Sequence, residues 1–285
     1  MAFPEPSSPL PSNVSGRLPD VAPAELRWYE RLNTLNVTLA IFVLLAILSA
    51  GVLKGSGRDV AVMDRISSLL DAMYPPDLSV WKDASGALAE TARIAVWATL
   101  FGFAISFPLA MAASSNVSPR WLVFVTRLAM CSLRTIPSII WAMVGVAIVG
   151  PNALAGVIGL TMYSVGYLVK FFSDAFESMD DKIADGLKGM GASSFQAFMH
   201  GTLPHAKPLI WSSTLFMLEY NLRSGTIIGF VGAGGIGVLL HSYWEYGQLD
   251  RFATVMLVLL APVVTLDLLG NWARGRITRR VAVKS

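Results

Sequence analysis

The chain has 285 residues, of which 54% are apolar and only 14% are Asp, Glu, Lys or Arg. Soluble domains carry about a quarter charged residues. This composition, with a mean hydropathy of +0.57, therefore excludes a disordered protein, a disulfide scaffold and an ordinary soluble enzyme. The net charge of +3 does not indicate a nucleic-acid partner. The single cysteine, Cys131, can form no disulfide within the chain, and we expect it to be a small core residue.

Six apolar runs are long enough to be transmembrane helices, since a span needs roughly 17–25 mostly apolar residues. Each span must be helical, because an isolated strand in lipid leaves its backbone groups without hydrogen bonds. Gly150-Pro151-Asn152 predicts a tight hairpin between the third and fourth runs, and Pro108 and Pro137 are expected to kink or end two helices. We therefore predict an all-α polytopic membrane protein with about six spans: Leu35–Leu53, Ile94–Ala113, Leu128–Val149, Ala153–Val169, Leu209–Val231 and Phe252–Leu269.

The distribution of basic residues predicts which connections face the cytoplasm. Lys and Arg are concentrated towards both ends of the chain and in the segments 120–127 and 182–207. In the segment 54–83, by contrast, acidic residues offset the basic ones. Because cytoplasmic connections carry the excess of Lys and Arg, both termini are predicted to lie in the cytoplasm.

The first 34 residues are rich in Pro and Ser and are predicted to form a partly disordered cytoplasmic tail. This polar segment is too long for a typical signal peptide, so the run that follows is interpreted as a retained helix. Met63–Met73 has apolar residues at helical spacing, which predicts an amphipathic helix on the outer membrane surface. The transmembrane domain is expected to cover 35–272, followed by a basic cytoplasmic tail at 273–285.

The segment 174–208, between the fourth and fifth runs, is longer than a connection between adjacent spans requires. Ala192–His200 has the apolar spacing of a short amphipathic helix. Gly191 before it allows a tight turn between two short helices. Leu203-Pro204 is expected to end the second helix and direct the chain back to the membrane.

The spacing of this loop resembles the cytoplasmic signature loop of ABC importer permeases, which reads Glu-Ala-Ala, three residues, Gly, nine residues, Ile-x-Leu-Pro. This sequence has Asp for the Glu, Gly186-Leu187 for the two alanines and Gly201 for the Ile. In that family the loop forms coupling helices that dock in a groove on the ATP-hydrolysing subunit. The resemblance implies an ATPase-coupling site made of Asp185, Gly191, Ala192, Ser193, Leu203 and Pro204.

Three further segments resemble the phosphonate-type branch of these permeases: Pro75-Pro76-Asp77 followed by Glu90–Ala95, then Arg134–Pro137, then Glu219–Arg223 leading into Gly229–Gly237. The resemblance implies a type I ABC importer permease fold in the bacterial inner membrane, and a cargo of phosphonate, phosphate or phosphite. The implied partners are a second copy of the chain, two ATP-binding cassette subunits and an extracytoplasmic solute-binding protein. ATP and magnesium would bind in the cassette subunits, and this chain would bind no cofactor and catalyse no reaction.

Three charged residues within the apolar runs are candidates for a solute route. Glu219 and Arg223 are four residues apart, so they share a helix face and can pair, and Arg134 lies in the third run. Charged residues inside a membrane usually face a pathway or a partner, and Arg can form two hydrogen bonds with a phosphorus oxyanion. These residues either line or gate the solute route, or they are structural, with Arg134 extending to an interface.

The segment Gly229–Gly237 contains five glycines. A nucleotide-binding loop would need a preceding strand in a βαβ unit, whereas this segment follows a membrane run. The chain has no Walker-type Gly-Lys-Ser/Thr sequence and is predicted not to bind ATP. Gly232, Gly234 and Gly235 are instead expected to allow close helix packing or a re-entrant turn at an outer gate.

Three other functions remain open. The glycine-rich segment also resembles permeases for methionine and other small solutes. A self-contained secondary transporter would need a coupling-ion site, for which only Glu90, Glu219 and Asp267 are suitably placed, and it leaves the long loop unexplained. A membrane-embedded enzyme would need a catalytic or metal-ligand constellation, and no spacing in the sequence indicates one.

Overall fold

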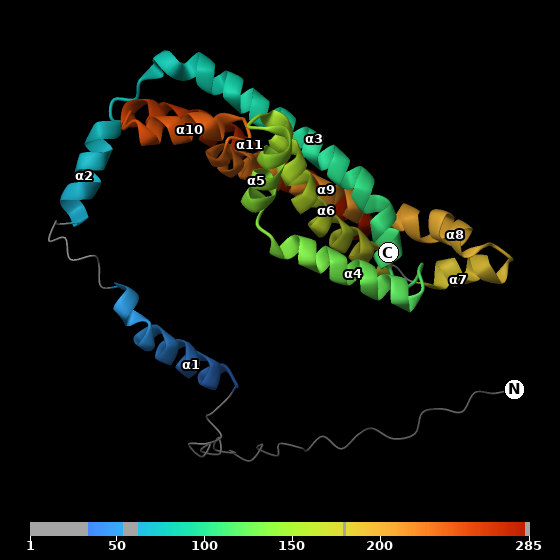
Figure 1. The fold of residues 1–285 in the computed structure, drawn as a ribbon. Coiled ribbons are helices and arrows are strands. Elements are labelled where there is room, and N and C mark those ends of the chain that lie inside the picture. Colours follow the sequence, from blue (N-terminus) through green and yellow to red (C-terminus); the bar gives the residue numbers. More distant parts are fainter. Residues whose placement is uncertain (1–33, 54–61, 179–180, 283–285) are drawn as a thin grey trace, which may run out of the picture. The chain divides into compact units, whose positions relative to one another are not determined.

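The computed structural model describes residues 34–53, 62–178 and 181–282, and within these ranges every regular element is a helix (Figure 1). The chain divides into two units, residues 1–61 and 62–285. The first unit contains α1 (Thr34–Leu48), followed by a 3-10 turn (Ala50–Leu53). The predicted tail lies outside the described residues, apart from residue 34, where α1 begins.

The second unit contains the remaining helices, and α6 lies among them in contact with α3, α4, α5 and α9. Glycines on α6 allow this close packing, as small residues do between membrane helices. A Cβ atom at Gly159 would lie 2.6 Å from the backbone of Ala142 in α5. The helices are α2 (Val62–Met73), α3 (Trp81–Ala113), α4 (Arg120–Thr135), α5 (Ser138–Val149), α6 (Ala153–Glu177), α7 (Asp181–Gly189), α8 (Ser194–Ala197), α9 (Leu203–Ile228), α10 (Ile236–Glu245) and α11 (Leu249–Ala282).

The all-α polytopic class is confirmed, but the described helices differ in length from the six predicted runs. Two helical segments in the described ranges, Leu78–Ala113 and Ala153–Glu177, are long and apolar enough to cross a membrane. The number rises to four if two bent helix pairs, α4 with α5 and 194–231 with α10, each count as one span. The first predicted run contains only a shorter apolar helix, and the last lies within α11.

The third predicted run is divided into two helices, α4 and α5, that meet at an angle of 87°. Pro137 lies between them, and Ile136 before it is extended, as the residue before a proline tends to be. The predicted hairpin follows, with Gly150 at a φ of +81°. The Asn152 side chain accepts hydrogen bonds from the first amides of α6. Pro108, in contrast, lies inside α3 and does not end it, since membrane helices tolerate proline.

The amphipathic helix predicted at 63–73 is confirmed as α2, and its apolar side chains at Met63, Ile66 and Leu70 are exposed. The segment that follows α2 is bonded to the start of α11. The Arg251 Nε donates to Asp77 Oδ2 at 3.1 Å, and the Thr254 Oγ1 donates to the Asp77 carbonyl at 2.8 Å. Hydrogen bonds from Ser79, and to a smaller extent the Arg251 guanidinium, lower the pKa of the Asp77 carboxyl below its ordinary value.

Candidate functional site

The predicted coupling loop is a pair of short helices, α7 and α8. Gly191 lies between them with a φ of +93°, a conformation that glycine adopts without steric cost, so the predicted tight turn is confirmed. Ser193 and Gln196 cap α8 reciprocally through side-chain and backbone hydrogen bonds. Because α6 extends to Glu177 and α9 begins at Leu203, the connection is shorter than the predicted 174–208.

The prediction that Leu203-Pro204 ends the second helix is wrong. One continuous helix runs from Ser194 to Val231, through a π-helical segment at Phe198–Thr202 and into α9. Pro204 occupies the first turn of α9, and the backbone N–H of Leu203 bonds to the Phe198 carbonyl instead of to residue 199. Pro204 has no backbone N–H to donate. The helix continues because the hydrogen-bond pattern shifts before the proline and because the proline lies in the first turn of α9.

Two large apolar side chains are exposed around the turn between α7 and α8, a region called here the α7–α8 surface. Met190 and Phe195 are 79% and 60% exposed. Asp185 of α7, whose carboxylate forms an ion pair with Lys188 at 3.3 Å, is also exposed. Gly201 packs against α7, because a Cβ atom there would lie 3.3 Å from the Leu187 side chain.

The Glu219 and Arg223 side chains form the pair expected from their spacing, with 3.1 Å between Glu219 Oε1 and the Arg223 guanidinium. Glu219 is 14% exposed, whereas Arg223 is 57% exposed. The guanidinium therefore keeps donors available on the surface of α9 while the carboxylate is largely covered. Whether this pair lines a route or is structural stays a prediction.

Between these two residues lies Asn221, a buried polar residue that reasoning from the sequence did not single out. Its amide Nδ2 donates to Thr99 Oγ1 of α3 at 3.0 Å and to Ser164 Oγ of α6 at 2.8 Å. All three side chains are buried, so the amide joins α3, α6 and α9 in a region without solvent. The alternation of polar and apolar residues on α9 gives no signal for this contact, because both partners are distant in sequence.

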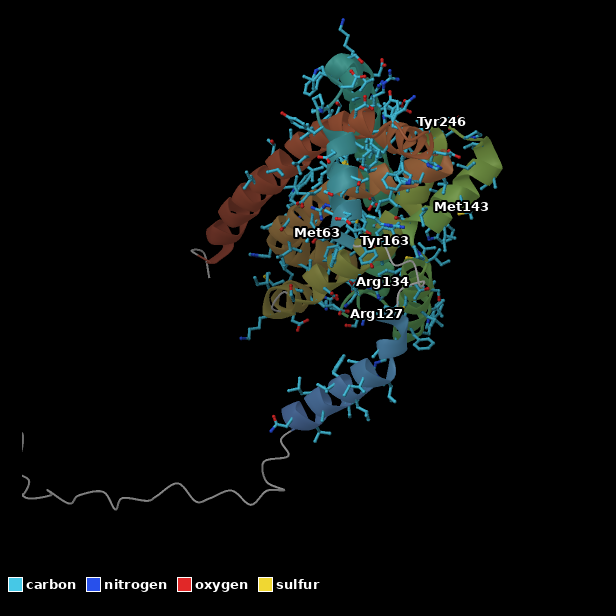
Figure 2. All side chains as sticks on the ribbon, turned by 90° about the vertical axis from the view of Figure 1, so that its left-hand side faces the viewer. Met63, Arg127, Arg134, Met143, Tyr163 and Tyr246 are labelled. Carbon is cyan, nitrogen blue, oxygen red and sulfur yellow. The ribbon has the colours of Figure 1, made fainter. Side chains whose placement is uncertain are left out.

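Arg134 is in the last turn of α4, where a positive charge complements the helix dipole. Its guanidinium lies 5.6 Å from the ring centroid of Tyr167. Tyr167 is next to Tyr163, with 4.7 Å between ring centroids, and Tyr163 stacks on Tyr220 at 5.1 Å. The tyrosines thus link Arg134 to α9, at the residue adjacent to Glu219, and Figure 2 shows Arg134 between Tyr163 and Arg127.

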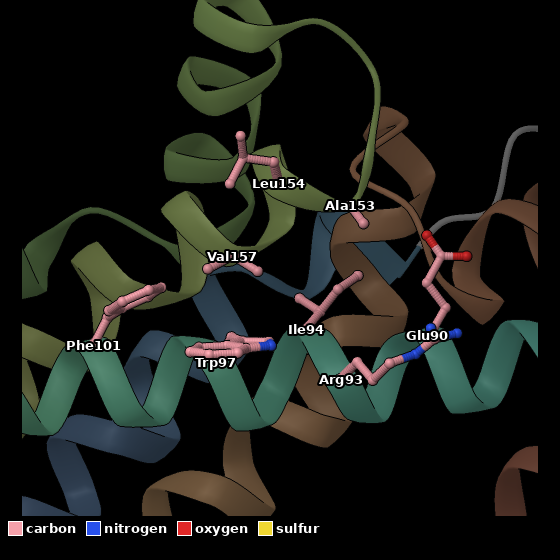
Figure 3. A pocket seen from close by; sticks show the side chains of 8 residues that line it. All are labelled: Glu90, Arg93, Ile94, Trp97, Phe101, Ala153, Leu154 and Val157. Atoms are coloured by element: carbon pink, nitrogen blue, oxygen red, sulfur yellow. The ribbon is translucent and has the colours of Figure 1, made fainter.

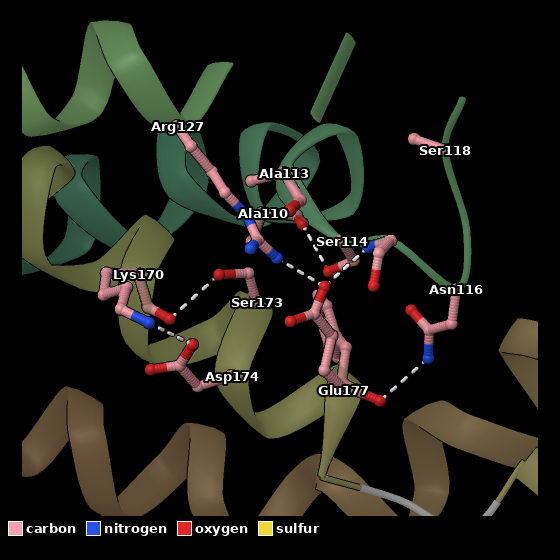
Figure 4. A network of polar contacts seen from close by, with 12 residues as sticks. Ala110, Ala113, Ser114, Asn116, Ser118, Arg127, Lys170, Ser173, Asp174 and Glu177 are labelled. Carbon is pink, nitrogen blue, oxygen red and sulfur yellow. Dashed lines mark hydrogen bonds and ion pairs between the residues drawn. The ribbon is translucent and has the colours of Figure 1, made fainter. Parts of the chain in front are cut away.

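A polar network joins the loop after α3 to α4 and to the end of α6 (Figure 4). Arg127 forms an ion pair with Glu177 and donates from Nε to the Ala113 carbonyl at 2.9 Å. The backbone N–H of Ser115 donates to the same Glu177 carboxylate at 2.6 Å, and Asn116 donates to the Phe176 carbonyl at 3.0 Å. These segments were predicted to share the cytoplasmic side, and the structure brings them together at one end of α6.

The glycine-rich segment forms a sharp turn between α9 and α10, which meet at 45°. Gly232, Gly234 and Gly235 have φ values of +81°, +83° and +78°, so each requires the conformational freedom of glycine. The buried Thr91 of α3 accepts a hydrogen bond from the backbone N–H of Ile236 at 2.8 Å. The segment is therefore a glycine-dependent turn that Thr91 holds against α3, and whether it is re-entrant or a bend within one span stays a prediction.

The α5–α6 hairpin and α3 line the same end of the bundle as this turn. A Cβ atom at Gly234 would lie 2.8 Å from Glu90 Oε1 and 2.9 Å from Ala153 Cα. Beside it is a pocket of about 570 Å³ between α3 and α6, with Glu90 and Arg93 at one end and Trp97 and Phe101 towards the other (Figure 3). The segments predicted to be on the outer side thus meet at one end, opposite the polar network.

The residues proposed for a coupling-ion or metal site do not form a cluster in the part of the chain that the structure describes. Among the described residues, no group of three or more His, Cys, Asp or Glu side chains could hold a metal ion. Glu90 and Glu219 belong to separate elements, α3 and α9, and the side chain of Asp267 lies outside the described residues. Cys131 was expected to be a core residue, but it is exposed, because α4 buries few of its side chains.

The helix bundle carries paired short helices at one end and a glycine-rich turn at the other, and comparison with known proteins identifies its class as ABC importer permeases. The chain belongs to the family of binding-protein-dependent transport system inner membrane components, whose model matches residues 104–283. It is 32% identical to the phosphite transport system permease protein of Stutzerimonas stutzeri, over 85% of this chain and 88% of that protein. It is 31% identical to the phosphate-import permease protein of Mycolicibacterium smegmatis, over 87% of this chain but 48% of that protein.

Solved structures show the same fold. A structure of the MetNI methionine ABC transporter has a TM-score of 0.60 and 24% identity, and the match covers 69% of this chain and 95% of the other. The type I permease fold and the resemblance to phosphite, phosphonate and phosphate permeases are thereby confirmed. The chain is a membrane component of an ABC importer, and its apolar helices agree with location in the inner membrane.

Proposed function

We propose that this permease imports phosphite, phosphonate or phosphate. The observation that carries the proposal is the likeness to the Stutzerimonas stutzeri phosphite permease, which extends over 85% of the chain. The likeness to the methionine transporter supports a common fold and not a common cargo, because the identity is 24%. Arg134, which forms no ion pair among the described residues, and Arg223, whose side chain is 57% exposed beside Glu219, carry guanidinium groups suited to an oxyanion.

The chain works in this proposal as a homodimer with two ATP-binding cassette subunits, which bind ATP and magnesium. The cassettes contact the α7–α8 surface around Asp185, Gly191, Ala192 and Ser193, with Met190 and Phe195 as apolar anchors. An extracytoplasmic solute-binding protein delivers the oxyanion to the end formed by the glycine-rich turn. Both termini are cytoplasmic, as the distribution of basic residues predicts.

The route through the membrane passes the polar residues of α4 and α9. Arg134 and Arg223 attract the oxyanion, and Glu219 keeps Arg223 oriented while reducing its affinity, which allows the solute to leave. The turn at Gly232, Gly234 and Gly235 acts as the outer gate, because its glycines permit a change in the angle between α9 and α10. Leu203 and Pro204 belong to the helix that connects the cassette contact to this route.

The test is uptake of labelled phosphite by cells that lack other phosphorus importers and express this chain with its cassette and binding protein. Uptake that phosphate or a phosphonate competes with, and methionine does not, supports the proposal. Arg223→Ala should lower uptake with normal amounts of protein in the membrane, while Arg120→Ala, at the exposed start of α4, should leave it unchanged. Methionine uptake without phosphite uptake would show that the cargo assignment is wrong.

A further inference from the structure

A small pocket between α4 and α6 concentrates three basic side chains. It has a volume of about 190 Å³, and Arg127 and Arg134 of α4 and Lys170 of α6 line it, together with Cys131 and Ser173. Pockets for drug-sized ligands measure about 300–1,000 Å³, so this one suits a much smaller solute. Figure 4 shows Arg127 and Lys170 on opposite sides of Ser173.

The charges around the pocket do not cancel. Arg127 is paired with Glu177, and Lys170 is paired with Asp174, so two carboxylates oppose three cations. Arg134 has no carboxylate within 4.0 Å in the part of the chain that the structure describes, and its guanidinium donates to the Cys131 sulfur at 3.9 Å. A site with one net positive charge and unused guanidinium donors favours a small anion with several acceptor oxygens.

Two contacts constrain Arg134, one through its side chain and one through its backbone. Its guanidinium lies over the Tyr167 ring at 5.6 Å, and a Cβ atom at Gly166 would be 3.3 Å from the Arg134 backbone. The glycine therefore lets α4 approach α6 closely at this residue. Preorganised donors lose less entropy on binding than flexible ones, which favours recognition of an anion at this position.

We infer that this pocket binds the phosphorus oxyanion in transit, near the end of the bundle that carries the coupling helices. The identity of the anion rests on the proposed function, whereas its charge and size rest on the pocket itself. Lys170 and Asp174 lie in the last two turns of α6, shortly before α7 begins at Asp181. An oxyanion here competes with Asp174 and Glu177 for their cations, which links solute occupancy to the segment that contacts the cassettes.

Cys131 allows a direct test, because it lines the pocket and is the single cysteine of the chain. The assembled transporter, in nanodiscs of phosphatidylcholine, is treated with methanethiosulfonate reagents that carry a sulfonate or a trimethylammonium group. Labelling of this chain is followed by intact mass, with rates normalised to those for a free thiol. We expect the anionic reagent to react several-fold faster than the cationic one, and phosphite to slow labelling several-fold compared with sodium chloride at equal ionic strength.

Matched variants assign the effect to the pocket. Arg134→Gln should remove both the preference for the anionic reagent and the protection by phosphite, and Arg134→Lys should retain part of the preference. Arg120→Gln, which removes the same charge at the other end of α4, should change neither. Labelling that is independent of reagent charge, or unaffected by phosphite, would overturn the inference, provided that the same preparation hydrolyses ATP.

Two further arms separate the inference from its rivals. Protection that occurs only in nanodiscs containing phosphatidylglycerol, and without phosphite, would make the pocket a lipid headgroup site and overturn the assignment to solute. If cells take up labelled phosphite but the rate of Cys131 modification does not depend on reagent charge, the assignment of the pocket is overturned while the proposed function stands. Absence of uptake of any phosphorus oxyanion by a complex that hydrolyses ATP would overturn the proposed function, and with it the identity of the anion.

Discussion

Replacement of Gly237 by alanine tests the geometry of the α9–α10 turn. A Cβ atom at Gly237 would lie 1.8 Å from the Thr226 carbonyl oxygen and 3.0 Å from Gly229 Cα. Both neighbours are backbone atoms of α9 and the turn, so neither can rotate away as a side chain does. Overpacking of this kind typically costs about 1–3 kcal/mol. We expect a loss near 3 kcal/mol, because the two helices have to separate.

Gly86→Ala is the matched control, since it makes the same chemical change inside α3. No atom lies within 4 Å of a Cβ placed at Gly86, and the residue is exposed. Alanine is more favourable than glycine in a helix interior by about 0.8–1.0 kcal/mol, so this variant should be neutral or more stable than the wild type. The two variants thus differ in the predicted sign of the effect.

The measurement is reversible unfolding of the purified protein in mixed micelles of dodecyl maltoside and increasing dodecyl sulfate, followed by circular dichroism. Gly237→Ala should unfold at a clearly lower dodecyl sulfate fraction than the wild type, and Gly86→Ala at an equal or higher one. Equal stability of the two variants would show that α9 and α10 do not approach each other as closely as described. Uptake by Gly237→Ala should fall as well, if the turn acts as the gate.

Three other changes have defined outcomes. Asn221→Leu should lower the free energy of unfolding by about 1–2 kcal/mol in the same micelle assay, because the interhelical hydrogen bonds of Asn221 with Thr99 and Ser164 are lost and such bonds in membranes average about 0.6 kcal/mol each; unchanged stability would contradict it. Gly191→Val should reduce transport and transport-linked ATP hydrolysis with normal membrane insertion, since its φ of +93° disfavours valine; normal transport would contradict this. The lowered pKa of Asp77 means that its carboxylate stabilises the fold above the ordinary pKa of about 3.9, and that this contribution disappears as the pH falls through the depressed value. Stability of Asp77→Asn should therefore vary less with pH below about 5, and parallel pH profiles for the two proteins would refute the assignment.

Local signals in the sequence predicted the features that depend on backbone chemistry. Pro137 predicted the break between α4 and α5, Gly150-Pro151-Asn152 predicted the hairpin, and the helical spacing of 63–73 predicted α2. Gly191 predicted the turn between two short helices. Each of these depends on a few adjacent residues whose conformational preferences are strong.

Contacts between distant segments were not predictable in the same way. Asn221 meets Thr99 and Ser164, which are 122 and 57 residues away in sequence, and nothing in the local pattern identifies these partners. The same applies to Thr91 and the glycine-rich turn, 145 residues apart. A buried hydrogen bond between helices depends on their packing, so it becomes visible only when the helices are placed.

The continuous helix from Ser194 to Val231 changes how coupling should be understood. If Pro204 ended a helix, movement of α8 would be absorbed by a flexible joint before it reached the membrane. Instead, 38 residues of helix, about 57 Å at 1.5 Å per residue, connect the α7–α8 surface to the glycine-rich turn. Glu219, Asn221 and Arg223 lie on this helix, and α9 contacts α3, α6 and α11 along it.

Under the proposed function, a displacement of α8 by a cassette subunit therefore moves the candidate route and the candidate gate together. Under the same proposal, the candidate hinge lies at Gly232, Gly234 and Gly235, whose backbone conformation favours glycine.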